Sequence, residues 1–203
     1  MPAVEFWLEF ASTYSYPAAM RIASLAREAE VTVRWRPFAL GPIFKQQGLP
    51  LDSPFNWQPA KARYMWHDVE RLCTGLGLPF RKPDPFPQPS LLAARIALIG
   101  LPQGWGEDFA CAVYRAEFGG GRQIGDAAVM AEILSGLDLD AAAILARAQG
   151  DEIKAELRGV TEQAQRLGIF GAPSFVTEDG ELFWGNDRLE QALAWAKRPK
   201  DAA

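Results

Sequence analysis

The hydrophobic pattern of the first 36 residues changes from one period to another and predicts a β-α-β unit. Residues 4–10 are a short run of bulky apolar side chains, which is typical of a buried strand. From Ala18 to Glu28 the apolar residues recur at helical spacing, and Pro17 suits the first turn of that helix. Residues 31–36 then alternate apolar with polar side chains, as a half-buried strand does.

The C-terminal part of the chain returns to the same mixture of elements. A helix is predicted from Asp151 to Leu167, with Gly168 directly after its end. The elements expected after it are a strand at 174–177, a turn, a return strand at 181–184, and a helix at 187–197 with Asn186 as its N-cap.

Between these two parts the pattern predicts a loop followed by a block of helices. Residues 37–57 are rich in proline, glycine and aromatic residues and predict a long ordered loop, a kind of loop that is often functional. Five prolines between residues 78 and 89 exclude a regular element there. Helices are expected at 59–76, 91–101, 105–117, 126–135 and 139–148.

The order of the elements is that of an α/β, thioredoxin-like fold (β-α-β … α-β-β-α) with an all-helical insertion in the middle. We expect residues 1–37 and 151–203 to form the thioredoxin-like domain, which is discontinuous in sequence. Residues 38–150 would then form the loop and the helical insertion.

Composition and charge exclude several classes of protein. The chain has 203 residues, of which 49% are hydrophobic and 23% charged, as in an ordinary globular domain. Its net charge is −4 and it has no run of Lys or Arg, so we expect no nucleic-acid partner. No apolar run is long enough to span a bilayer, and the N-terminus lacks the pattern of a signal peptide. We therefore expect a cytoplasmic protein with no membrane partner.

Few residues could serve triad, metal or redox chemistry. His67 is the only histidine, which disfavours a Ser-His-Asp triad and a histidine-rich metal site, so no metal is expected. Cys73 and Cys111 are the only cysteines and form no Cys-x-x-Cys motif. We interpret them as reduced, structural residues.

The turn after the first strand, Ser12-Thr13-Tyr14-Ser15-Tyr16, is the first of three segments that could carry chemistry. A hydroxyl at the start of a helix lies in the positive end of the helix dipole and can donate a hydrogen bond to an anion. The alternative is that Ser12 or Thr13 simply caps the helix.

The other two segments lie near the C-terminus. We predict that the Ala172–Pro173 bond is cis, because the order of elements needs this strand start to face the Ser12 turn. Its backbone could then pair with an extended, peptide-like ligand, whereas an ordinary trans turn is the alternative. In residues 183–188, Asp187 could hold a ligand ammonium or could be no more than a first-turn acid.

In combination these segments resemble a known family. Residues 10–16 resemble the opening motif of 2-hydroxychromene-2-carboxylate isomerases and kappa-class glutathione transferases, which have a DsbA-like thioredoxin fold. Residues 33–38, 41–45, 170–173 and 183–189 are similar to later blocks of that family. The chain departs from the pattern at Thr13, where proline is usual, and at Leu49, where the loop often carries asparagine nearby.

The resemblance implies a glutathione-dependent enzyme, and we expect a homodimer. Ser12 would be the catalytic residue and would donate a hydrogen bond to the glutathione thiolate. The other glutathione-binding residues would be Ala172, Pro173, Trp184, Gly185, Asn186 and Asp187. A small aromatic substrate would contact Phe38, Phe44, Lys45, Asn56, Trp57 and Tyr64. The alternative for these aromatic residues is that they belong to the hydrophobic core.

Three functions are left open at this point. The first is a glutathione-dependent isomerase of the 2-hydroxychromene-2-carboxylate type, acting on an aromatic-degradation intermediate by addition and elimination of the thiolate. The second is a kappa-like glutathione transferase, which would release the adduct. The third is a non-catalytic module that binds a peptide or a thiol. A disulfide oxidoreductase is disfavoured because residues 11–16 contain no cysteine.

Overall fold

The computed structural model describes residues 1–49 and 58–198. Its N-terminal elements are β1 (Ala3–Leu8), α1 (Ser15–Ala29), β2 (Thr32–Pro37) and α2 (Leu40–Gln46). The helical block consists of α4 (Pro59–Gly75), α5 (Leu91–Gly100), η1 (Leu101–Gln103), α6 (Gly106–Tyr114), η2 (Arg115–Gly119), α7 (Ala127–Ser135) and α8 (Ala141–Ala148). The C-terminal elements are α9 (Asp151–Arg166), β3 (Ser174–Thr177), β4 (Leu182–Trp184), η3 (Asn186–Arg188) and α10 (Leu189–Ala196).

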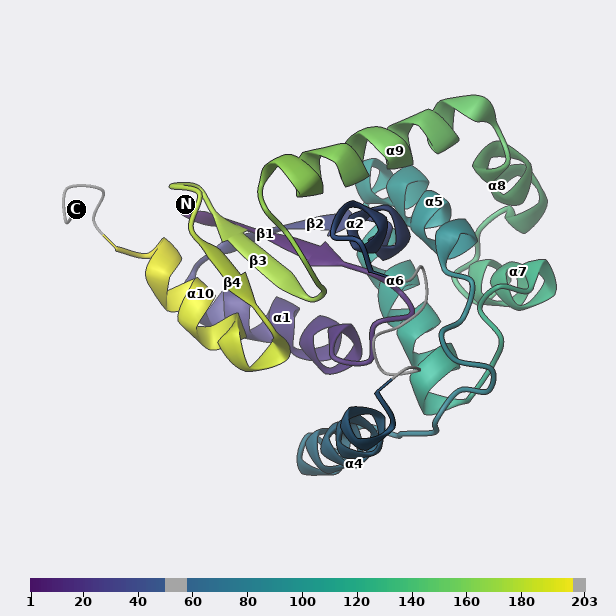
Figure 1. The fold of residues 1–203 in the computed structure, drawn as a ribbon. Helices are drawn as coiled ribbons and strands as arrows, with labels where there is room; N and C mark the ends of the chain where they lie inside the picture. The colour runs from purple at the N-terminus through teal and green to yellow at the C-terminus, as the bar shows by residue number, and fades with distance from the viewer. Residues whose placement is uncertain (50–57, 199–203) are drawn as a thin grey trace.

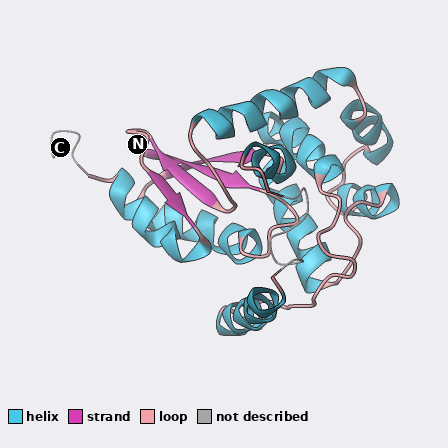
Figure 2. Ribbon diagram, in the orientation of Figure 1, coloured by secondary structure: helices cyan, strands magenta, loops and turns pink. Residues whose placement is uncertain are grey.

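One mixed sheet with the strand order β2-β1-β3-β4 forms the centre of the molecule (Figure 2). β1 runs parallel to β2, with α1 as the connection between them, and antiparallel to β3. β4 pairs antiparallel with β3 and forms the edge of the sheet. Because β1 lies between strands from both ends of the chain, the residues that follow it lie close to those that precede β3.

Helices cover both faces of the sheet (Figure 1). α1 and α10 pack on one face, and α9 with α2 packs on the other. The helical block, from α5 to α8, extends beyond the β2 side of the sheet (Figure 1). Within the part of the chain that is described, no helix has the length and apolar character needed to cross a bilayer.

Alternation along β1 divides the core between the two faces of the sheet. Phe6 is fully buried on the α1 face, with its ring centroid 4.9 Å from that of Trp35 and 5.5 Å from that of Phe175. Trp7 is fully buried on the α9 face, 6.0 Å from Phe38. The core on the α1 face also contains buried residues of α5 and α6, so the helical block and the sheet share one core.

The predicted α/β order and most element boundaries are confirmed, and within residues 1–49 and 58–198 one α-helix was not predicted. α2 lies inside the segment that the sequence predicts to be a loop. Its prolines and glycines obscure a short helical pattern, in which Leu40, Ile43 and Phe44 share one face. Ile43 is buried in the core on the α9 face, and this packing stabilises a helix that local propensity disfavours.

The predicted N-cap at Asn186 is wrong, and so is the alternative in which Ser12 or Thr13 caps the first helix. α1 begins at Ser15 after Tyr14, without a side-chain capping bond, so neither Ser12 nor Thr13 caps it. Residue 186 begins the short 3₁₀ helix η3 instead of capping a long α-helix, and Arg188 precedes α10. The predicted helix at 105–117 is divided as well, because α6 ends at Tyr114 and continues as the π-helical turn η2.

We expect Phe175→Ala to lower the free energy of unfolding by about 3–5 kcal/mol, because it removes a fully buried ring that stacks on Phe6. Urea denaturation measures the change. Leu91→Ala is the control, because that side chain is 47% exposed and its loss should cost less than about 1 kcal/mol. Equal losses for the two variants would contradict the position of Phe175 in the core.

Candidate functional site

The turn between β1 and α1 is directly bonded to the loop that precedes β3. The Ser12 hydroxyl donates a hydrogen bond of 2.8 Å to the carbonyl of Ala172, 160 positions away in the sequence. The backbone N–H of Ser12 donates to the Glu9 carbonyl at 3.0 Å, and the N–H of Ser15 donates to the Ser12 carbonyl at 3.1 Å. The Ser12 hydroxyl is therefore held by a turn with two backbone bonds and does not serve the helix as a cap.

The second and third candidate segments are also joined to one another. The Ala172–Pro173 bond is cis, as the sequence analysis predicts. The carbonyl of Pro173 accepts a hydrogen bond of 2.9 Å from the N–H of Gly185. Gly185 has a φ of 110°, and a Cβ there would lie 2.6 Å from the Asp187 Oδ1, so this position requires glycine. Ser12, Ala172 and the start of η3 thus form one continuous site.

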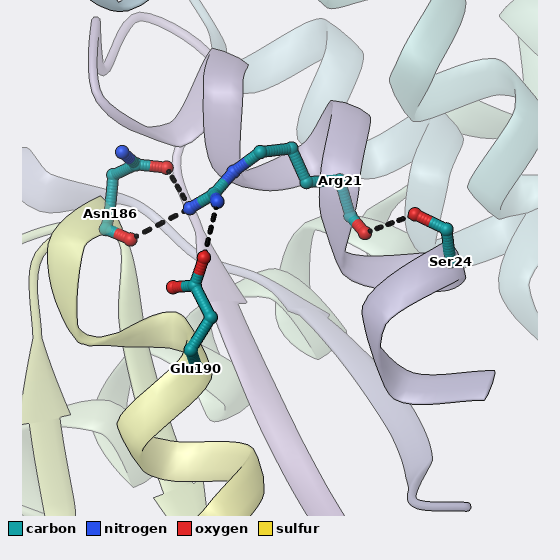
Figure 3. A network of polar contacts seen from close by, with 4 residues as sticks. All are labelled: Arg21, Ser24, Asn186 and Glu190. Atoms are coloured by element: carbon teal, nitrogen blue, oxygen red, sulfur yellow. Dashed lines mark hydrogen bonds and ion pairs between the residues drawn. The ribbon is translucent and has the colours of Figure 1, made fainter. Parts of the chain in front are cut away.

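An arginine on α1 fixes η3 (Figure 3). One guanidinium nitrogen of Arg21 donates to the carbonyl of Asn186 at 3.1 Å and to its side-chain oxygen at 3.0 Å. A second guanidinium nitrogen forms an ion pair of 2.5 Å with Glu190 on α10. Asn186 is 5% exposed, whereas the side chain of Asp187 is 73% exposed. Asp187 is therefore the acid that η3 presents to solvent, and Asn186 is part of its support.

Helix α4 packs against the other side of the Ser12 turn. The Thr13 hydroxyl donates to the Met65 sulfur at 3.3 Å, and the Tyr14 hydroxyl donates to the Asp68 carboxylate at 2.9 Å. Burial, together with the nearby Asp68, raises the pKa of Tyr14 well above its usual range. Both hydroxyls are thus committed to α4. Thr13 replaces the usual proline of the family motif, and here it forms a contact that proline lacks.

The structure describes four of the six residues predicted to contact an aromatic substrate, and these four lie on different elements. Phe38 is 1% exposed and packs on Trp7, so the core alternative is correct for Phe38. Phe44 is half-buried and Lys45 exposed on α2, which packs against α9. Tyr64 is 63% exposed on α4, beneath the guanidinium of Arg71 at 5.6 Å. Asn56 and Trp57 lie outside the described residues.

An exposed aromatic pair lies beside Ala172. The rings of Phe170 and Trp184 are 44% and 52% exposed, and their centroids are 5.0 Å apart. The indole of Trp184 lies over Gly171, where a Cβ would be 2.5 Å from its Nε1. The sequence predicts a site role for Trp184 but not for Phe170, because nothing in the linear pattern shows that the two rings meet.

Two buried acids lie behind the Ser12 turn, and sequence reasoning missed both. The carboxylate of Glu9 accepts hydrogen bonds from the Ser90 hydroxyl and the N–H of Ala11, and burial raises its pKa to about 7. Glu117 is fully buried in η2 with no partner for either carboxylate oxygen. Burial, together with the nearby Glu9, raises the pKa of Glu117 well above its usual range. The one sequence signal is at Glu9, an acid between the apolar residues Leu8 and Phe10.

The cysteines behave as structural residues. Cys73 is buried, Cys111 is half-buried, and both are free thiols. Burial raises the pKa of each to about 11, so little reactive thiolate forms near neutral pH. Over residues 1–49 and 58–198, no group of three or more His, Cys, Asp or Glu side chains suits a metal ion.

Comparisons with known proteins agree with this architecture. A family model described as "DSBA-like thioredoxin domain" matches residues 3–194. The 2-hydroxychromene-2-carboxylate isomerase of Sphingobium xenophagum is 29% identical over 187 residues, covering 92% of this chain and 94% of that protein. Glutathione s-transferase kappa 2 of Caenorhabditis elegans is 26% identical over 216 residues, covering 97% and 92%. A solved structure of 2-hydroxychromene-2-carboxylate isomerase has a TM-score of 0.85 at 23% identity, covering 95% and 93%. The predicted family resemblance and the thioredoxin-like fold are thereby confirmed.

The buried Glu9 makes a pH-dependent contribution to stability. Its pKa rises from 4.5 to about 7 on folding, so its contribution is full below about pH 4.5 and is lost as the pH rises towards 7. Each pKa unit corresponds to about 1.4 kcal/mol, so Glu9 should lower the free energy of unfolding of the wild type by about 3 kcal/mol over this pH range. We expect this decrease to be absent in Glu9→Gln. Urea denaturation at several pH values between these limits measures it.

The exposed Glu152→Gln is the control for this measurement and should leave the pH dependence of the wild type unchanged. A Glu9→Gln variant that loses as much stability as the wild type over the same pH range would show that Glu9 carries no proton in the folded state.

Proposed function

Because the chain belongs to the family of DSBA-like thioredoxin domains, we propose that it is a glutathione-dependent isomerase of the 2-hydroxychromene-2-carboxylate type. The observation that carries the proposal is the hydrogen bond from the Ser12 hydroxyl to Ala172. This bond holds a hydroxyl group, and no thiol, at the strand–helix turn, directly beside the loop whose backbone we propose to pair with glutathione. The similarity to a 2-hydroxychromene-2-carboxylate isomerase over most of the chain supports it.

Glutathione binding would replace the hydrogen bond between Ser12 and Ala172 with two hydrogen bonds to the ligand. The Ser12 hydroxyl has a single proton, which the Ala172 carbonyl accepts in this structure. When the ligand binds, its cysteinyl N–H would donate to that carbonyl instead, and the freed hydroxyl would donate to the sulfur. The N-terminal end of α1 adds its partial positive charge at the same place. Both effects favour the thiolate over the thiol.

The γ-glutamyl end of glutathione would lie at η3. The exposed Asp187 carboxylate would pair with the ligand ammonium, and Asn186 would contribute its amide N–H groups because its oxygen accepts from Arg21. Pro173, Gly185 and Trp184 would line the segment between Ser12 and η3. This assignment uses the three segments that the hydrogen bonds of the structure join.

The chemistry needs no net redox change. The thiolate would add to a conjugated carbon of the substrate and form an S–C bond, which turns the adjacent double bond into a single bond. The ring of the adduct would then open, which permits rotation about this single bond. After the rotation the S–C bond would break, the double bond would re-form and the thiolate would leave. Glutathione is regenerated, so it acts as a cofactor. Of the described residues, Phe44, Lys45 and Tyr64 are the proposed contacts of the aromatic substrate.

A kappa-like glutathione transferase is the second candidate, favoured by the 26% identity to the C. elegans protein over 97% of this chain. The two functions differ in the fate of glutathione. Incubation with 2-hydroxychromene-2-carboxylate and a limiting amount of glutathione separates them. Many turnovers per glutathione with no loss of free thiol support the isomerase, and stoichiometric loss of thiol with a stable conjugate supports the transferase.

We expect Ser12→Ala to lower the glutathione-dependent rate roughly 10²–10³-fold, the usual effect of removing one preorganised donor to an anion. The loss of its bond to Ala172 should cost only about 1 kcal/mol of stability. Ser24→Ala is the matched control, because this exposed serine of α1 bonds only to the Arg21 carbonyl (Figure 3). A Ser12→Ala variant with wild-type turnover would rule out the catalytic role.

We expect Asp187→Asn to weaken glutathione binding roughly ten- to hundred-fold, because one charge-assisted hydrogen bond is lost. Stability should change little, because the side chain is 73% exposed. Isothermal titration calorimetry measures the affinity. Asp151→Asn is the matched control, an exposed acid in the first turn of α9 that should leave the affinity unchanged. Equal affinities of the wild type and Asp187→Asn would return Asp187 to the role of an ordinary helix-start acid.

A further inference from the structure

Glu9 is attached to the Ser12 turn through both its backbone and its side chain. Its carbonyl accepts the N–H of Ser12 at 3.0 Å and the hydroxyl of Tyr114 at 3.0 Å. Its carboxylate accepts the N–H of Ala11, the residue directly before Ser12, and the hydroxyl of Ser90. A charge on this carboxylate would therefore lie against the N–H of Ala11, directly before the residue whose hydroxyl is proposed to hold the thiolate.

Glu117 lies in the π-helical turn η2, a kind of element that is frequent at functional sites, and is near enough to Glu9 for the two carboxyl groups to interact electrostatically. Its side chain has 0% exposure, and neither carboxylate oxygen has a hydrogen-bond partner. Tyr114 of α6 lies beside both acids. The hydroxyl of Ser15, on α1, is fully buried beside the hydroxyl of Tyr114.

No cation balances these two acids. Within the described ranges, neither Glu9 nor Glu117 forms an ion pair with a lysine or an arginine. Two buried carboxyl groups without a cation cannot both be ionised at low cost, so the pair retains at least one proton near neutral pH. Titration of such a pair belongs to the two groups together.

We propose that Glu9 and Glu117 are positioning residues that control the charge behind the Ser12 turn: with both protonated, they let the turn hold an anionic sulfur, and with Glu9 ionised, the pair repels it. This inference rests on the proposed glutathione site and deepens it. Burial raises the pKa of Glu9 to about 7, so the change in charge falls near neutral pH. Repulsion between partly buried charges is large enough to change an affinity roughly ten-fold.

Two glutathione derivatives test the proposal. Glutathione sulfonate carries a negative charge at sulfur at every pH used, and S-methylglutathione carries none. Their affinities are measured by calorimetry from pH 6 to pH 8.5 and expressed as a ratio, which cancels titration of the shared γ-glutamyl group. In the wild type we expect the preference for the sulfonate to fall about ten-fold over this range. In the Glu9→Gln/Glu117→Gln variant we expect a ratio that does not change with pH.

The control and the contrary outcomes separate this proposal from the proposed function. The exposed Glu152→Gln should behave as the wild type does. If both probes bind with a pH-independent ratio in the wild type, or if the pH dependence persists in the double variant, the role of the acid pair is overturned and the glutathione site stands. If neither probe binds, the glutathione site is wrong and this inference falls with it.

A single substitution gives a second test if the double variant does not fold. The Ser90 hydroxyl donates to the Glu9 carboxylate and lowers its pKa. Ser90 makes no capping bond to α5, so Ser90→Ala should leave that helix intact. We expect the midpoint of the pH-dependent ratio to move to higher pH in Ser90→Ala. An unmoved midpoint would show that a group other than Glu9 titrates.

Discussion

The central position of β1 is the constraint on which the rest of this structure depends. β1 is buried on both faces and pairs with β2 on one side and β3 on the other, so its C-terminal end lies deep in the molecule. The chain must turn there, and the Ser12 turn meets the loop before β3 as a direct result. Every other part of the candidate site is attached to that meeting point.

The surroundings of the turn combine strong burial with few charges. Aromatic rings fill the space behind it, and Tyr114 lies between Phe10, Tyr16 and Phe118. In such surroundings a hydroxyl donor or a helix end acts on an anion more strongly than it would in water. The same low polarity makes an ionised acid expensive, which is why Glu9 and Glu117 matter more than acids on the surface.

The sequence predicts this fold well where a hydrophobic period extends over a whole element. β1, β3 and α9 are examples, and the turn residue Gly168 has the positive φ expected at a helix end. Prediction fails where tertiary packing decides. α2 is a helix because Ile43 is buried, and Ser12 bonds across the chain instead of capping α1.

The candidate site shows the same division. The three glutathione-related segments are recognisable from local residue types, and the structure joins them. Phe38, by contrast, is a core residue. The sequence could not show this, because an aromatic side chain near the end of a strand can point into the core or into a binding site. The roles of Arg21 and Glu117 could not be predicted from the sequence. Arg21 bonds to Asn186, far away in the chain, and Glu117 is buried without a hydrogen-bond partner for its carboxylate.

The position of Arg21 has a mechanical consequence. Helix α1 begins directly after the Ser12 turn. Further along the same helix, the guanidinium of Arg21 bonds to η3 and α10. Helix α1 therefore connects the Ser12 hydroxyl at one end of the site with Asp187 at the other end. If α1 shifts within the molecule, both ends travel with it, and the span between Ser12 and Asp187 is preserved.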